Sequence, residues 1–213
     1  MMIETEEEAK AFVAERCSDA AFAKLEQFVA ELRIEAEHQN LISRSTIDSV
    51  WQRHVADSAQ LLDHVPRETS GTWLDIGTGA GFPGIITAIM RPDLPHVLCE
   101  PRAKRVTWLE RMVTLAKLGN CRVAGSRVEK VETFAADFIS ARACASLKDL
   151  ISLSARFSTD ATYWVLPKGR SAAQERDELD SQQRAMFHVE QSLTSRDAAI
   201  LVGRGRPKGG SRQ

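Results

Sequence analysis

Thr72-Trp-Leu-Asp-Ile-Gly-Thr-Gly-Ala-Gly-Phe-Pro-Gly84 is the stretch that decides the fold of this chain. Its apolar start predicts a buried β-strand, and Gly77, Gly79 and Gly81 follow directly. Because glycine has no Cβ, the backbone there can adopt positive φ and a ligand can approach its amide groups closely. Pro83 suits the first turn of a helix. The stretch therefore predicts a strand, a ligand-binding turn and a helix.

The charge beside this turn indicates which cofactor binds there. Gly79, Gly81 and Gly84 fit the Gly-x-Gly-x-x-Gly pattern. In dinucleotide-binding proteins, this pattern places a pyrophosphate at the helix N-terminus. We expect Asp75, however, to present a carboxylate at the mouth of the turn, where it would repel a pyrophosphate but attract a cation or accept hydrogen bonds. S-adenosylmethionine carries an ammonium and a sulfonium and has no phosphate. The sequence therefore favours S-adenosylmethionine over NAD.

A second predicted strand, at 96–100, ends in an acidic residue. Glu100 follows the glycines by about 20 residues, the spacing at which an acidic side chain binds ribose hydroxyls in this architecture. We predict Glu100 as the ribose ligand. The alternative is a solvated acid at the end of a strand.

Strands and helices alternate along most of the chain. The predicted strands lie at 72–76, 96–100, 121–125, 137–140 and 161–166, with helical stretches between them such as 102–118 and 146–157. This alternation predicts an α/β fold with a mostly parallel sheet covered by helices on both faces, and the apolar run 198–202 is expected to close the sheet. Before the first strand, Thr5–Glu8 and Ser45–Asp48 each resemble the capping box of a helix.

Composition limits the classes of protein to consider. A chain of 213 residues that is 43% hydrophobic can bury a sizeable core, and most simply forms one structural domain. No apolar run approaches the ~20 residues of a membrane span, and the acidic start does not resemble a signal peptide, so we expect a cytoplasmic protein. The cysteines and histidines are scattered, which predicts no metal site and four reduced, mostly buried thiols.

Charge is unevenly distributed although the net charge is only −1. Residues 1–37 hold ten acidic and four basic side chains, whereas the remainder holds nineteen acidic and twenty-four basic ones. We therefore expect an anionic partner to bind beyond residue 37. The tail 204–213 is basic and rich in glycine, which predicts a flexible segment; it either binds phosphate or is a solvated terminus.

Five short motifs occur in an order and spacing that resemble a known family. They are Gly77–Gly84, Arg53–Ser58, Lys104–Val106, Ser126–Glu129 and Ala141–Ala143. Together they resemble the RsmG (GidB) bacterial rRNA methyltransferases, over about residues 40–169. The resemblance implies a class I S-adenosylmethionine-dependent methyltransferase with a Rossmann-like core, which transfers a methyl group to N7 of one guanine of 16S rRNA near the decoding site.

On this basis we divide the chain into three parts: an N-terminal helical extension at 1–70 that packs on the core, a Rossmann-like methyltransferase core at 71–203, and the tail at 204–213. The resemblance also implies roles for individual residues. Gly77 and Phe82 match positions that contact the cofactor; the alternative for Phe82 is an ordinary core residue. Val128 and Glu129 match a pair that frames the adenine, the alternative for Glu129 being a solvated helix start.

Arg142 matches a position at the junction of cofactor and substrate, and a structural ion pair to Asp75 or Glu129 is its alternative role. Guanine N7 has an in-plane lone pair, so its methylation needs no general base. We therefore assign no catalytic acid or base, and Arg142 is a positioning candidate. His54, Asp57 and Ser58 lie on one predicted helix face but form no credible hydrolase triad; packing or RNA contact is expected of them instead.

Basic side chains that follow the predicted strands are candidates to bind RNA phosphates. The candidates, with His54 added, are Lys104, Arg105, Arg127, Lys168 and Arg170. Arg102, at the start of the same predicted helix as Lys104, shares their edge of the sheet. The expected partner is 16S rRNA in the small ribosomal subunit or an assembly intermediate of it, bound by a monomer that uses neither membrane nor DNA.

Three other functions remain open at this point. A class I methyltransferase acting on a small molecule would share the glycine turn but would not need the basic edge. An NAD-dependent oxidoreductase would share the fold but conflicts with Asp75. A non-catalytic RNA-binding module would keep the basic edge and would tolerate a change at Gly77.

Overall fold

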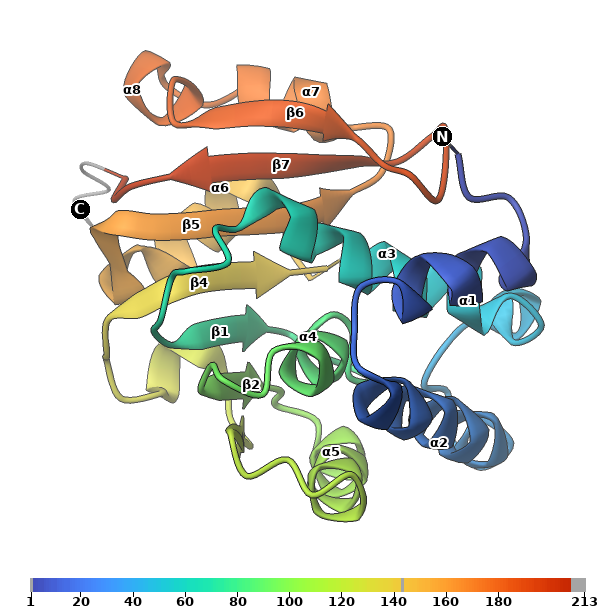
Figure 1. The fold of residues 1–213 in the computed structure, drawn as a ribbon. Helices are drawn as coiled ribbons and strands as arrows, with labels where there is room; N and C mark the ends of the chain where they lie inside the picture. Colours follow the sequence, from blue (N-terminus) through green and yellow to red (C-terminus); the bar gives the residue numbers. More distant parts are fainter. Residues whose placement is uncertain (1, 143, 208–213) are drawn as a thin grey trace.

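The computed structural model, which describes residues 2–142 and 144–207, is built around a seven-stranded sheet (Figure 1). The strand order is β3-β2-β1-β4-β5-β7-β6. The first five strands are parallel, and β7 is antiparallel to both of its neighbours. The strands are β1 Trp73–Ile76, β2 His96–Cys99, β3 Cys121–Ala124, β4 Ala136–Ala141, β5 Ser158–Lys168, β6 Phe187–Gln191 and β7 Ala199–Arg204. The predicted mostly parallel sheet is confirmed.

Helices cover both faces of this sheet, and each layer has its own apolar cluster. One layer contains α1 Glu6–Ala14, α2 Asp19–Glu35, η2 Trp51–Ala56, α3 Asp57–Ala59, α4 Gly84–Met90 and α5 Ala103–Leu115. The other contains α6 Leu147–Ser154, η5 Ala155–Phe157 and α7 Ala172–Asp177. The described residues also form four short helices: η1 Arg44–Thr46, η3 Gln60–His64, η4 Val128–Lys130 and α8 Ser181–Arg184.

The N-terminal helices share a core with the glycine turn rather than forming a separate unit. Phe28 of α2 packs edge-on against Phe82, with ring centroids 5.5 Å apart, and lies 6.0 Å from Trp108 of α5. All three rings are at most 2% exposed. Burial of each such ring is worth roughly 1.5–3 kcal/mol, so α2 helps to hold the turn in place.

Helix η2, which carries Arg53 and His54, starts in a way that the sequence did not reveal. The capping box at Thr5 and Glu8 is confirmed. The one expected at Ser45–Asp48 is wrong, because η2 begins after Val50 without a local side-chain cap. Its first amides donate instead to the carboxylate of Glu6, at 3.1 Å from Trp51 and 2.7 Å from Gln52. Helix α1 therefore caps η2 across space.

The C-terminal strands form an antiparallel hairpin at one edge of the sheet (Figure 1). The apolar run 198–202 falls mostly in β7, as predicted. The family resemblance implies an antiparallel edge hairpin here, but the sequence pattern did not predict the residues of β6. The predicted start of the tail is wrong, because Arg204 still pairs with Tyr163 and Gly205 accepts a hydrogen bond from Trp164 Nε1 at 2.9 Å. The rest of that prediction, at 208–213, lies outside the described residues.

Two further sequence expectations concern the thiols and the helices. Cys17, Cys99, Cys121 and Cys144 are free, but only Cys99 is buried and Cys144 is exposed, so the expectation of mostly buried thiols is wrong. Burial and nearby acids raise the pKa of Cys99 to about 12. Among residues 2–142 and 144–207, no helix is long and apolar enough to cross a membrane.

Candidate cofactor and substrate site

The turn after β1 has the backbone conformation that its glycines permit. Gly77 has φ +68°, and a Cβ there would lie 2.8 Å from the Cβ of Cys144. Gly81 has φ +112°, and its Cβ would lie 2.8 Å from Ile85 and 3.2 Å from the ring of Phe28. Both positions exclude a side chain, but for different reasons. Gly77 faces the loop after β4, whereas Gly81 faces the helix layer.

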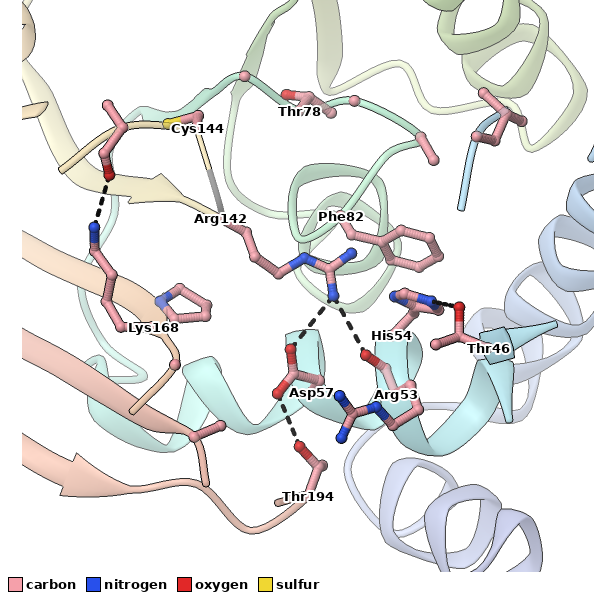
Figure 2. A pocket seen from close by; sticks show the side chains of 18 of the residues that line it. Thr46, Arg53, His54, Asp57, Thr78, Phe82, Arg142, Cys144, Lys168 and Thr194 are labelled. Atoms are coloured by element: carbon pink, nitrogen blue, oxygen red, sulfur yellow. Dashed lines mark hydrogen bonds and ion pairs between the residues drawn. The ribbon is translucent and has the colours of Figure 1, made fainter. Parts of the chain in front are cut away.

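A cavity of about 1130 Å³ opens over the carboxyl ends of the strands, where open α/β sheets bind their ligands (Figure 2). Its walls come from seven separate segments of the chain. They are the segment 41–46, helices η2 and α3, the glycine turn 77–82, residues 100–105, the loop after β4, the end of β5 with the segment that follows it to Glu175, and the loop between β6 and β7 with the first residue of β7. The sheet therefore gathers into one cavity residues that are more than a hundred positions apart.

The expectation that Asp75 presents its carboxylate at the mouth of the turn is wrong. Asp75 is fully buried and does not line the cavity. Its carboxylate accepts hydrogen bonds from the amide of Gly84 at 3.0 Å and the hydroxyl of Ser140 at 2.7 Å. Burial raises the pKa of this carboxyl to about 6, although these hydrogen bonds lower it in part. Asp75 thus ties β1 to the start of α4 and closes the turn.

The turn nevertheless favours a cofactor without a pyrophosphate. The amides of Gly77 and Thr78 donate to Cys99 O, at 2.8 and 3.2 Å, and the amide of Gly79 donates to Glu100 Oε2 at 3.0 Å. The Gly84 amide, at the N-terminus of α4, is held by Asp75. A dinucleotide needs such groups for its phosphates. Because acceptors within the protein occupy these amide groups, the turn suits S-adenosylmethionine better than a dinucleotide. The physical reason differs from the predicted one, which was repulsion by Asp75.

Glu100 lines the cavity and is only 3% exposed. One carboxylate oxygen accepts from Gly79 and the other from the amide of Arg102 at 2.9 Å. Each oxygen of an ionised carboxylate can accept a second hydrogen bond. Glu100 is therefore held by backbone in a position to bind two hydroxyl groups, and its assignment as ribose ligand stays a prediction.

Phe82 and His54 form one stacked wall of the cavity (Figure 2). Their ring centroids are 4.9 Å apart. The hydroxyl of Thr46 donates to Ser43 O at 2.8 Å and therefore accepts from His54 Nε2, 2.9 Å away. Burial, aided by Arg142 and Arg53, lowers the pKa of His54 to about 3. His54 is thus a neutral stacking residue, poorly suited to bind phosphate by charge.

Arg142 leaves the end of β4 and points into the cavity, 21% of its side chain being exposed (Figure 2). Its Nη1 lies 3.4 Å from Asp57 Oδ2 and 3.3 Å from Arg53 O, and its guanidinium lies 5.0 Å from the ring centre of Phe82. The predicted ion pair to Asp75 or Glu129 is wrong, because Asp57 is the partner. Asp57 also accepts from Thr194 at 2.8 Å, which joins Arg142 to the β6–β7 loop.

The predicted adenine pair lies outside the lining of this cavity. Val128 is 5% exposed and belongs to the apolar cluster of the α6 layer, where Arg156 donates to its carbonyl. Glu129 is exposed. Their role with adenine stays a prediction, and it requires the cofactor to extend beyond the cavity walls.

The predicted RNA-binding residues differ in whether their charge is available. Lys168 is 8% exposed, and its ammonium donates to Ala145 O and Glu175 Oε2, both at 2.8 Å, so its charge is engaged inside the protein and its role with phosphate stays a prediction (Figure 2). Arg170 is exposed but pairs with Asp197 at 2.6 Å. Lys104 and Arg127 are exposed outside the cavity lining, whereas Arg105 lines it.

Two cavity arginines were not among the principal sequence candidates. Arg53 and Arg102 are exposed, line the cavity, and form no ion pair with another described residue. Arg53 is the first residue of the Arg53–Ser58 motif, and this motif is the sequence signal that could have identified it as a site residue. Thr194, in contrast, comes from a loop without any recognisable motif, and only the sheet topology brings it to the site.

Comparison with known proteins adds to this geometry. The family model described as rRNA small subunit methyltransferase G matches residues 21–199. A protein of Erythrobacter litoralis (strain HTCC2594) named ribosomal RNA small subunit methyltransferase G is 61% identical over 97% of this chain and 100% of its own.

Two solved structures share the fold at low sequence identity. The ribosomal protein L11 methylase of Lactobacillus delbrueckii subsp. bulgaricus has a TM-score of 0.57 and 14% identity, over 72% of this chain and 79% of its own. A SAM-dependent methyltransferase of Aquifex aeolicus has a TM-score of 0.55 and 16% identity, over 73% and 92%. The fold is thus that of class I methyltransferases, and the sequence match over most of the chain places this protein in the rRNA small subunit methyltransferase G (GidB) family.

Proposed function

We propose that this protein transfers the methyl group of S-adenosylmethionine to N7 of one guanine in 16S rRNA near the decoding site, in the cytoplasm and as a monomer. The observation that carries this proposal is that one cavity holds both the glycine turn and two exposed arginines, Arg53 and Arg102, that form no ion pair within the described part of the chain. At about 1130 Å³ it exceeds the ~300–1000 Å³ of ordinary small-molecule pockets. A cofactor and an extruded nucleotide can therefore share it.

The side chains of the cavity suit a reaction that needs no general base. S-adenosylmethionine would supply the electrophilic methyl group, and guanine N7 attacks with its own lone pair. His54 is neutral, and the carboxylate of Asp57 is engaged with Arg142 and Thr194. Positioning alone can supply ~7–11 kcal/mol of a barrier of this kind. Catalysis is thus assigned to orientation, with Arg142 holding the junction between cofactor and base.

The residues that would hold the cofactor follow from the walls of the cavity. Gly77 and Gly79 line the cavity, and a Cβ at Gly79 would have no neighbour closer than 3.5 Å, so a flat ligand can approach the turn there. Glu100, the predicted ribose ligand, lines the same cavity. Phe82 supplies an aromatic wall next to Arg142. Val128 and Glu129 are assigned to the adenine on the family resemblance alone.

The substrate is proposed to be the small subunit or an assembly intermediate in which the target loop is open. In A-form RNA the deep groove hides N7 from side chains, so the base must be splayed out of its stack. A small-molecule methyltransferase is the weaker alternative, because the unpaired arginines at the rim would then serve no ligand.

Methyl transfer from labelled S-adenosylmethionine tests this function. Small subunits that lack their own N7-methylguanine are compared with large subunits and with transfer RNA. Label in the small subunit alone supports the proposal. Cofactor binding without transfer to any RNA would overturn it and favour the small-molecule alternative.

A further inference from the structure

A second cavity, of about 810 Å³, lies beside the first. It is lined by the segment 36–44, which connects α2 to η1, and by Arg105 of α5. Leu41 and Arg105 line both cavities, so the two adjoin at these side chains. None of the functional roles assigned above uses residues 36–44.

Arg105 is held between the two cavities by weak contacts. Its Nη1 lies 3.9 Å from Glu100 Oε2, on the side of the first cavity. Its Nη2 lies 3.4 Å from the carbonyl oxygen of Asn40, on the side of the second. A quarter of the side chain is exposed. Because neither contact is short, the guanidinium keeps donors available for a phosphate that lies across the boundary.

Arg44 supplies a second positive charge to this cavity. It is exposed and forms no ion pair or side-chain hydrogen bond with the residues that the structure describes. Glu37 is the acidic residue of the lining, against Arg44 and Arg105. The charge of the cavity is therefore net positive, and it suits an anionic ligand.

The remaining walls suit a base. Leu41 and Ile42 are buried, at 6% and 8% exposure, and form an apolar surface. His38 is exposed and offers a ring on which a base can stack, and the amide side chain of Asn40 offers donors and acceptors. A phosphate site next to an apolar and aromatic wall is the arrangement that single-stranded nucleic acid requires.

We infer that the second cavity binds the nucleotide next to the target guanine, with Arg105 and Arg44 on the connecting phosphates. This inference rests on the proposed function, because it presumes an RNA substrate in the first cavity. It adds that the enzyme holds two unstacked nucleotides rather than one, and that the loop 36–44 is part of the RNA-binding surface.

Arg44→Ala tests the phosphate contact, because the residue is exposed and its loss leaves no partner unpaired. We expect the KM for small subunits to rise about tenfold and the slope of log KM against log salt concentration to fall by about 1, as for one lost phosphate contact. The Kd for S-adenosylmethionine should not change. Arg67→Ala is the matched control: it removes the same exposed charge before β1, at the opposite end of that strand, and should change neither quantity.

A photo-crosslink tests the base contact. Replacing His38 by p-benzoylphenylalanine should give a crosslink to a nucleotide directly adjacent to the methylated guanine. Unchanged KM and salt slope in Arg44→Ala, or a crosslink to a distant nucleotide, would overturn the inference while wild-type transfer leaves the proposed function standing. Absence of transfer by the wild-type protein to any RNA would overturn both.

Discussion

The carboxylate of Asp75 lies 3.0 Å from the amide nitrogen of Gly84, and this hydrogen bond closes the glycine turn from inside the protein. The second carboxylate oxygen accepts from Ser140, whose hydroxyl oxygen in turn accepts from Trp73 Nε1 at 2.8 Å. Asp75 therefore affects the cofactor site through its hydrogen bond to the backbone of the turn and not through contact with the cofactor. It fixes the conformation that exposes Gly77 and Gly79 to the cavity.

Asp75→Asn should change how stability depends on pH. Burial raises the pKa of Asp75 to about 6 from 3.8, so between these values the folded protein holds a proton that the unfolded chain has released. The free energy of unfolding of the wild type should therefore fall as pH rises through this window, by about 3 kcal/mol in total. The amide of the variant does not titrate, so its free energy of unfolding should not show this fall. Urea unfolding of both proteins between about pH 4 and pH 7 measures it.

The comparison of wild type and Asp75→Asn across this pH range also contains its own control. At the acid end of the range both side chains are neutral, so any difference there reports the changed hydrogen bonds to Gly84 and Ser140. A difference between the two proteins that stays constant across the window would show that Asp75 does not titrate as described.

Gly77→Ala should weaken binding of S-adenosylmethionine strongly. The left-handed backbone at φ +68° costs an alanine roughly 1–2 kcal/mol, and its Cβ would meet the Cβ of Cys144 at 2.8 Å. We expect at least about a tenfold increase in Kd, measured by titration calorimetry. Gly119→Ala is the matched control, because a Cβ there has no neighbour within 4 Å. Equal affinities in the two variants would argue against a cofactor at this turn.

Lys168→Ala and Arg102→Ala should affect RNA methylation in different ways. The ammonium of Lys168 holds Ala145 O and Glu175, so its removal should lower stability by about 1–3 kcal/mol and leave the salt dependence of KM unchanged. Arg102 is exposed at the cavity, so its removal should reduce the salt slope by about 1 with little effect on stability. A reduced slope in Lys168→Ala would show instead that Lys168 binds phosphate.

Much of the fold was predictable because its signals are local. The run of apolar residues into Gly77 marks β1 and the turn, and regular alternation marks the strands up to β5. The segment 187–191 gave no such signal. Strand β6 is held by antiparallel pairing with β7 and by packing of Phe187 against Trp164 of β5, with ring centroids 6.0 Å apart. These tertiary contacts leave no local pattern in the sequence of the segment.

The site was predictable in place but not in detail. The sequence indicated that Glu100, Phe82 and Arg142 lie at one edge of the sheet, and all three line the cavity. It could not show which charges are neutralised. Lys168 pairs with Glu175, and Arg142 pairs with Asp57, because the packing of helices and loops brings these acidic side chains close. A basic residue that follows a strand thus indicates where the site lies. Whether its charge is available to bind RNA depends on the side chains that tertiary packing brings next to it.

Mapping the methylated base tests the central claim most directly. Small subunits lacking their own N7-methylguanine are incubated with the protein and S-adenosylmethionine. Their RNA is then extracted, reduced and treated with aniline, which cleaves the chain at N7-methylguanine. We predict cleavage at a single guanine near the decoding site, and its loss with Gly77→Ala but not with Gly119→Ala. Methyl groups on another atom or at many guanines, or no cleavage despite cofactor binding, would contradict the account.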